Sequence, residues 1–176
     1  MRNQKVRFIT TTAVMLALLV ALQAATSAAG QIVTGSCVNA VLAVTTLIGG
    51  VWSGVIVAAL SPFCAKLFGI GPALLPITFG IALGNLVFVA LLHLLANGKK
   101  PIWQQAVGLV VAAAAKFAML YVVINKCIVP LMGDQVKPQQ AAKFLTMFSW
   151  PQLVTALIGG AVALAIAPVL RKALRK

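Results

Sequence analysis

Residues 103–129 read WQQAVGLVVAAAAKFAMLYVVINKCIV, and Lys116 is the one charged residue between Trp103 and Tyr121. An apolar run of this length exceeds the about 20 residues that an α-helix needs to cross the hydrocarbon core of a bilayer. Lys116 lies near the middle of the run, where a charge is costly to insert. The stretch therefore predicts a membrane-spanning helix with an internal cation.

The composition of the whole chain is that of a membrane protein. Of its 176 residues 62% are hydrophobic and 9% are charged, and the mean hydropathy is +1.07. Six spans of about 20 residues would occupy roughly 120 residues, which leaves little for a soluble domain. We therefore predict an all-α membrane protein, a single compact domain over residues 1–176. Its six expected helices are 8–29, 36–48, 51–67, 75–96, 103–129 and 149–170.

Polar or Gly- and Pro-rich stretches separate these helices. We expect Pro130 to end the fifth helix. Helix 36–48 is short for a complete span, so we expect it to tilt or to pack inside the bundle. The predicted connections are a loop at 30–35, a break at 68–76, a turn at 97–101 and the longest polar loop at 131–144.

The first apolar segment has two interpretations. It follows Arg2, Lys5 and Arg7 and is long enough to span the bilayer, but a basic start, an apolar middle and small residues at 24–29 also fit a secretory signal peptide. The apolar stretch is a little long for the middle of a signal peptide, and its removal would leave five spans with one terminus on each side. We expect it to be the first transmembrane helix.

The charged residues exclude several function classes. Fourteen Lys and Arg stand against one acid, Asp134, for a formal net charge of +13. The basic residues gather at the ends of apolar segments, as in membrane proteins, so we expect no nucleic-acid partner. A single acid provides no paired carboxylates, and no phosphate-binding Gly-Lys-Ser/Thr loop is present. We predict no enzyme activity, no metal, no cofactor and no energy source within the chain.

The positions of the basic residues predict the orientation of the bundle. Six crossings place both termini on one side of the membrane. Four basic residues fall on the opposite side: Lys66, Lys126, Lys137 and Lys143. Nine fall on the side of the termini: Arg2, Lys5, Arg7, Lys99, Lys100, Arg171, Lys172, Arg175 and Lys176. This asymmetry predicts that both termini are cytoplasmic.

Alanines recur at every fourth position of the first helix, at Ala13, Ala17, Ala21 and Ala25. Small side chains at this spacing form a seam along which another helix can approach closely, which is how membrane helices associate. The seam has three interpretations: a docking face for another subunit, a packing face inside the bundle, or a chance product of an Ala-rich chain.

Lys116 needs a partner, because no predicted helix holds an acid that would neutralise it. We interpret it as a ligand-binding residue. The alternatives are a side chain that snorkels through a thin part of the bundle or one that is deprotonated in an apolar site. Other polar residues at membrane depth fall at the centre or in the outer half, where a pocket open to the outside would collect them, although interhelical hydrogen bonds would explain each singly. The predicted pocket residues are Lys116, Asn85, Trp150, Gln152, Gln31 and Asn39.

These features resemble the substrate-binding S components of energy-coupling factor (ECF) transporters, which are small six-helix bacterial vitamin-uptake proteins. The resemblance covers the whole chain. It rests on size, on six hydrophobic segments with cytoplasmic ends, on the AxxxA run of the first helix, and on a loop followed by a short second helix. Segments 30–35 (GQIVTG) with Asn39, and 148–152 (FSWPQ), look similar to members described only generically.

The resemblance implies a bundle that binds a micronutrient from the outside, with helices four to six and the loop after helix one. The alanines of helix one would face a transmembrane T subunit coupled to two ATPases, in a bacterial cell membrane. No pattern identifies one vitamin, although Lys116 predicts an anionic group on the ligand. Two other classes stay open: a stand-alone channel or facilitator, and a structural or assembly factor.

Overall fold

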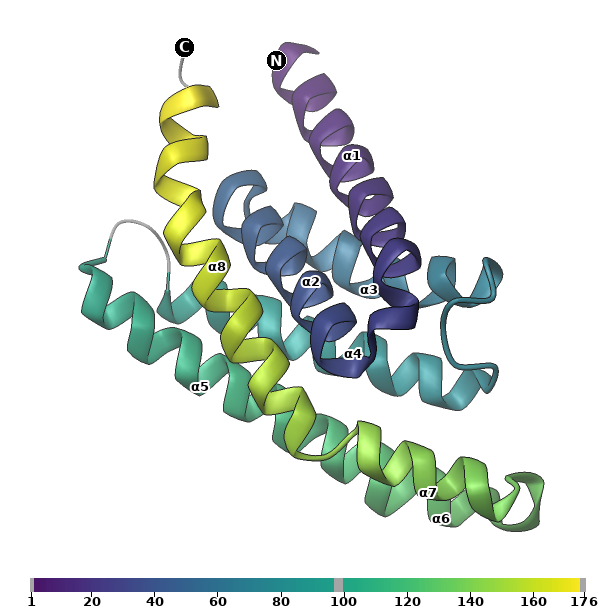
Figure 1. The fold of residues 1–176 in the computed structure, drawn as a ribbon. Helices are drawn as coiled ribbons and strands as arrows, with labels where there is room; N and C mark the ends of the chain where they lie inside the picture. The colour runs from purple at the N-terminus through teal and green to yellow at the C-terminus, as the bar shows by residue number, and fades with distance from the viewer. Residues whose placement is uncertain (1, 97–99, 175–176) are drawn as a thin grey trace.

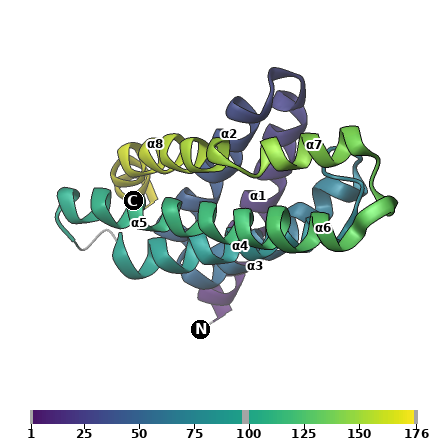
Figure 2. The same ribbon diagram turned by 90° about the horizontal axis from the view of Figure 1, so that it is seen from below.

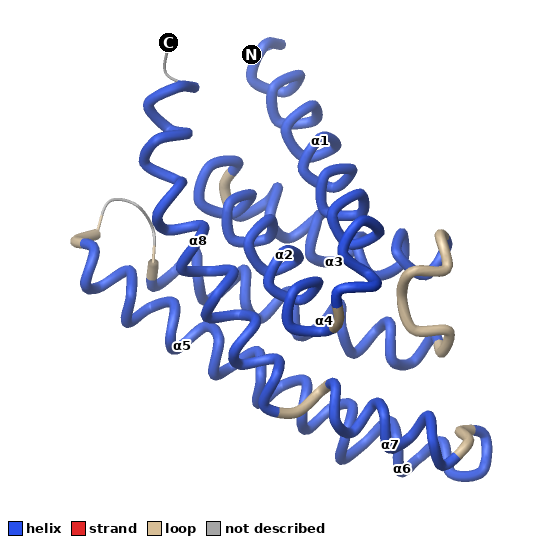
Figure 3. Tube along the Cα trace, viewed as in Figure 1, coloured by secondary structure: helices blue, strands red, loops and turns tan. Residues whose placement is uncertain are grey.

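The computed structural model describes residues 2–96 and 100–174, and helices joined by short loops make up almost all of them (Figure 3). No strand occurs in these two ranges. The elements in chain order are α1 (Arg2–Thr26), η1 (Ser27–Ala29), α2 (Gln31–Val44), η2 (Thr45–Gly49), α3 (Val51–Leu67), α4 (Leu75–Leu95), α5 (Ile102–Leu120), η3 (Tyr121–Ile128), α6 (Val129–Met132), η4 (Gly133–Gln135), α7 (Pro138–Met147) and α8 (Trp150–Leu174).

The prediction of a six-helix membrane bundle is confirmed. α3 is apolar but shorter than the other spans. Figure 1 shows both described ends of the chain at the same end of the bundle, as six crossings require. The segments long and apolar enough to cross a membrane are Gln4–Ala29, Gln31–Gly49, Leu75–Leu95, Ile102–Met132 and Trp150–Ala173. Residues 97–99, which make up most of the predicted turn 97–101, lie outside the described residues, and so do Arg175 and Lys176. The structure therefore does not describe three of the basic residues counted for the orientation: Lys99, Arg175 and Lys176.

The helices pack in an order that differs from their order in the chain. α2 lies against α8, α8 against α5, α5 against α4, and α4 against α3. α1 packs on α2 and α3 at one side of this arrangement (Figures 1 and 2). Most of the surface of α1 therefore stays uncovered by the rest of the chain.

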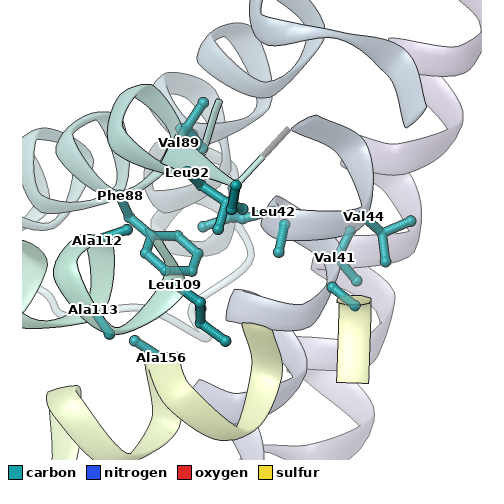
Figure 4. Close-up of a cluster of buried hydrophobic side chains, with 14 of the residues drawn as sticks. Val41, Leu42, Val44, Phe88, Val89, Leu92, Leu109, Ala112, Ala113 and Ala156 are labelled. Atoms are coloured by element: carbon teal, nitrogen blue, oxygen red, sulfur yellow. The ribbon is translucent and has the colours of Figure 1, made fainter. Parts of the chain in front are cut away.

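A cluster of buried apolar side chains from α1, α2, α3, α4, α5 and α8 forms a core between these helices (Figure 4). Leu42, Phe88 and Leu92 are all 0% exposed at its centre. Because lipid is as apolar as this core, close packing must hold the helices together. α8 approaches the backbone of α2 closely: a Cβ at Gly159 would lie 2.5 Å from the carbonyl oxygen of Ser36 and 2.6 Å from the amide nitrogen of Ala40.

The second helix begins earlier than predicted, so the expected loop at 30–35 is wrong. Gly30 has a φ of +86°, a left-handed conformation in which only glycine is unstrained. One residue thus reverses the chain, and α2 starts at Gln31. With the π-helical turn η2 the segment Gln31–Gly49 is long enough for a full span, and the prediction of a short second helix is wrong too.

The fifth span runs past Pro130, which corrects the prediction that this proline ends it. The helical segment continues from Ile102 to Met132 through the π-helical stretch η3. Pro130 lies in the first turn of α6, where the hydrogen-bond pattern has already shifted out of α-helical register and a missing N–H is tolerated.

The polar stretch 131–144 is also not the simple loop that we expected. It contains most of α7, which begins at Pro138, a favoured first helical residue. α7 buries one side against the bundle. Phe144 of α7 and Phe148, which follows its last residue, are buried with Ile124 in a second apolar cluster. In Figure 1 the end of the fifth span and α7 lie side by side and project from the bundle.

Gly159→Ala tests the contact between α8 and α2. The added methyl group meets backbone atoms of α2, which move only if the whole helix moves, so we expect a loss of about 1–3 kcal/mol of stability. Thermal unfolding in detergent measures the effect. Ala161→Val adds volume to an exposed position of the same helix and should leave the unfolding temperature unchanged. Equal unfolding temperatures for Gly159→Ala and wild type would contradict this packing.

Candidate functional site

A cavity of about 620 Å³ opens at the end of the bundle away from the termini. Its walls come from the end of α1, the start of α2, the end of α3 with the loop 70–74, the first half of α4, the middle of α5, and α7 with the start of α8. Pockets for small molecules commonly measure about 300–1,000 Å³. The cavity is therefore large enough for a metabolite of vitamin size.

Lys116 is the charged group at the inner part of this cavity, and it is only 2% exposed. Its Nζ donates to the Oδ1 of Asn39 at 2.6 Å and to the Oδ1 of Asn85 at 2.7 Å. The ring of Phe88 lies 5.4 Å from the same nitrogen. An ammonium group has three donors, so two amides occupy two of them and one is available to a molecule in the cavity.

Asn39 is itself held in place by its amide nitrogen. Nδ2 donates to the carbonyl oxygen of Gly35 at 2.9 Å and to Oγ1 of Thr155 at 3.2 Å. Thr155 Oγ1 in turn donates to the carbonyl oxygen of Gln152 at 3.2 Å. This network joins α5 and α4 to α2 and α8, and it fixes the amide so that its oxygen faces Lys116.

Two further predicted residues also line the cavity. Gln152 is buried, and its Nε2 donates to the carbonyl oxygen of Met147 at 3.0 Å, which ties α8 to the end of α7. Gln31 lines the cavity from the first turn of α2. The structure thus brings together Lys116, Asn39, Asn85, Gln152 and Gln31 around one space.

Trp150 does not belong to this group, which corrects the expectation that it shapes the pocket. Its side chain is 63% exposed and is not among the cavity-lining residues. Trp150 and Gln152 are two positions apart on α8, and such positions point to different faces of a helix. Because Gln152 faces the cavity, Trp150 faces the surroundings of the bundle.

α3 and α7 also contribute to the cavity, which was not predicted from the sequence. Ser61 is 2% exposed and lines the cavity, and its Oγ has no hydrogen-bond partner. A serine in a membrane helix normally bonds to its own backbone, so nothing in the sequence marked it. From α7 and the residue after it come Lys143, Phe144, Met147 and Phe148; the first two lay in the predicted loop 131–144, and the other two lay between that loop and the last predicted helix.

The cavity is positively charged. Lys116 is buried inside it and Lys143 is exposed at its edge, while none of the described residues that line it is acidic. The one acid of the sequence, Asp134, has a side chain outside the described part of the structure. The described residues also contain no group of His, Cys, Asp and Glu that could hold a metal ion. The site suits an anionic or neutral organic molecule.

The alanine seam of α1 lies on the surface of the chain. Ala13, Ala17, Ala21 and Ala25 are all exposed, whereas Leu19, which faces the bundle, is buried. The interpretation in which these alanines pack inside the bundle is therefore wrong. The seam is available to a helix of another polypeptide.

We predict that Asn85 stabilises the buried charge. Asn85→Leu preserves size but removes one acceptor of Lys116, and leaving a buried donor without its partner costs about 1–3 kcal/mol. Lys116→Met in the same chain removes the charge as well, so the double variant should recover most of the lost stability. Thermal unfolding in detergent measures both. A double variant less stable than Asn85→Leu alone would contradict this role.

Comparison with known proteins identifies the family. The family model described as "ECF transporter, substrate-specific component" matches residues 7–171, which cover four of the membrane-spanning segments in full and most of the first and last, Gln4–Ala29 and Trp150–Ala173. Comparisons with curated proteins and with solved structures give no significant match.

Proposed function

Because the chain belongs to the family of ECF transporter substrate-specific components, we propose that it captures a vitamin or related micronutrient at the outer face of a bacterial cell membrane for an ATP-driven importer. It is a multi-pass substrate-specific membrane subunit. Members of this family are transport subunits and not enzymes, and they associate with T and ATPase subunits.

One observation carries the proposal: a metabolite-sized cavity with a single buried cation, Lys116, opens at the end of the bundle away from the termini. The asymmetry of Lys and Arg in the sequence favours a cytoplasmic location for the termini. On that orientation the cavity faces the outside, where a scarce nutrient is captured. Two sets of hydrogen bonds are suited to keep the site in its binding conformation before the ligand arrives. Lys116 bonds to Asn39 and Asn85, and Gln152 bonds to the end of α7.

The exposed seam of α1 supports docking to a T subunit. Four alanines at every fourth position, which the described residues 2–96 and 100–174 leave exposed, allow a partner helix to approach closely. The sequence has no phosphate-binding loop of its own. Two ATPase subunits, connected through the T subunit, would supply the energy for transport.

Ala17→Trp and Ala21→Trp test the docking face. A bulky ring in the seam prevents close helix approach, and a misfit of about 1–3 kcal/mol corresponds to roughly 5-fold to 150-fold weaker association. The measurement is the amount of T and ATPase subunits that copurify with the tagged chain. Val110→Trp, at an exposed position of α5, is the matched control, and this variant should copurify with the T and ATPase subunits as wild type does. Ligand binding should survive in all three variants, and normal copurification of both seam variants would contradict docking through α1.

A second prediction separates the importer from a channel or facilitator. Vesicles that contain this chain alone should neither accumulate solute against a gradient nor equilibrate it quickly, because a packed core closes the inner end of the cavity. Vesicles with the chain, the T subunit and both ATPases should accumulate solute only when ATP is present. Rapid equilibration by the isolated chain would favour the channel interpretation instead.

A further inference from the structure

We infer that the ligand of this cavity is a carboxylic acid with a single negative charge and an apolar body, and that Ser61 binds its carboxylate together with Lys116. This inference rests on the proposed function, since it names the class of solute that the capture site takes. It adds a binding residue from α3 to those predicted from the sequence.

The charge of the ligand follows from the surroundings of Lys116. Its two protein acceptors, Asn39 and Asn85, are neutral amides, and the described lining of the cavity holds no acid. The buried positive charge is therefore not neutralised by those residues, and a bound anion would compensate it. An organic cation bound beside Nζ would instead be repelled by the lysine charge, and this repulsion is poorly screened in a buried site.

The number of buried cations favours one negative charge over two. A phosphate monoester carries between one and two charges near neutral pH and has three acceptor oxygens. Proteins usually bind it with Arg forks or with several backbone N–H groups. The described lining contains no Arg, and its second cation, Lys143, is exposed to solvent, where its field is screened.

The available donors match the two oxygens of a carboxylate. Lys116 has one N–H left after its bonds to the amides. Ser61 lines the same cavity and is only 2% exposed, and its hydroxyl has no hydrogen-bond partner. A buried hydroxyl without a hydrogen-bond partner destabilises the site, because it has lost its bonds to water without gaining others. A carboxylate that accepts from both groups satisfies the serine and neutralises the lysine at once.

Apolar side chains make up much of the remaining lining. Leu74 and Ile81 come from the loop before α4 and from α4 itself, and Pro62 directly follows Ser61 on α3. Phe144 and Phe148 line the cavity from α7 and from the residue after it. Together with a volume of about 620 Å³, these surfaces fit an acid whose body is largely apolar.

The test uses the metabolites of yeast extract as the probe. Ion-exchange chromatography separates them into cations, neutral compounds, carboxylates and phosphates, and each fraction is added to the purified full chain in mild detergent. Thermal unfolding reports binding. We expect the carboxylate fraction to raise the unfolding temperature, and we expect this effect to disappear after carbodiimide coupling converts the carboxylates to amides.

Variants of the two binding residues locate the carboxylate. Lys116→Met should abolish the response, with Lys116→Gln as a second variant that keeps hydrogen-bonding capacity. Ser61→Ala should weaken apparent affinity roughly tenfold, as expected when a hydrogen bond to a charged group is lost. Ser36→Ala is the matched control, because the Ser36 hydroxyl also lacks a partner but does not line the cavity. Asp134→Asn removes the only acid of the sequence, and both controls should respond as wild type does.

The outcomes separate this inference from the proposed function. Stabilisation by the cation, neutral or phosphate fraction alone, or a response that survives amidation, overturns the carboxylate while capture of a solute stands. A wild-type response in Ser61→Ala overturns the role of Ser61. If no fraction stabilises the chain and no small molecule copurifies with it, the capture function itself is contradicted and the inference falls with it.

Discussion

The structure depends on the burial of one uncompensated charge, Lys116, inside a bundle surrounded by lipid. Such a charge is costly at membrane depth, and this chain meets the cost with the carbonyl oxygens of Asn39 and Asn85. Because these amides come from α2 and α4, the three helices are fixed relative to one another at that level. The same arrangement keeps the charge unneutralised, which is what makes the cavity able to attract an anion.

The sequence predicted the centre of the site because lipid leaves polar residues few places to lie. A single Lys in an apolar run must face the bundle interior, and the few amides at the same depth are its available partners; Asn39 and Asn85 follow from that constraint. The same constraint did not predict Ser61, which lines the cavity, and it did not exclude Trp150, which does not. A serine can bond to its own helix, and a tryptophan is as stable at the membrane interface as in a pocket. Their orientation is decided by the rotation of each helix, which composition does not reveal.

The helix boundaries were harder to predict than the helices themselves, for a related reason. Glycine and proline normally mark helix ends, but here their effects depend on tertiary contacts. Gly35 lies within α2, where its missing side chain gives room to Thr155, whose Cγ2 would lie 2.9 Å from an added Cβ. Gly30, five residues earlier, makes the actual turn. Pro130 follows the π-helical stretch η3, which no local sequence pattern predicted.

The shape of the cavity also explains why a capture subunit needs a partner. The ring of Phe88 lies against Lys116 and is 0% exposed, and Leu42 and Leu92 are equally buried in the same cluster. A ligand bound at Lys116 therefore meets packed side chains on the side of the termini and an opening on the other side. If the chain captures its ligand as we propose, passage inward would require the helices to move apart, and the sequence has no phosphate-binding loop to drive that change. Among the five longer membrane-spanning segments, the one that contains α1 has the smallest buried share, which is why we propose α1 as the surface that contacts the T subunit.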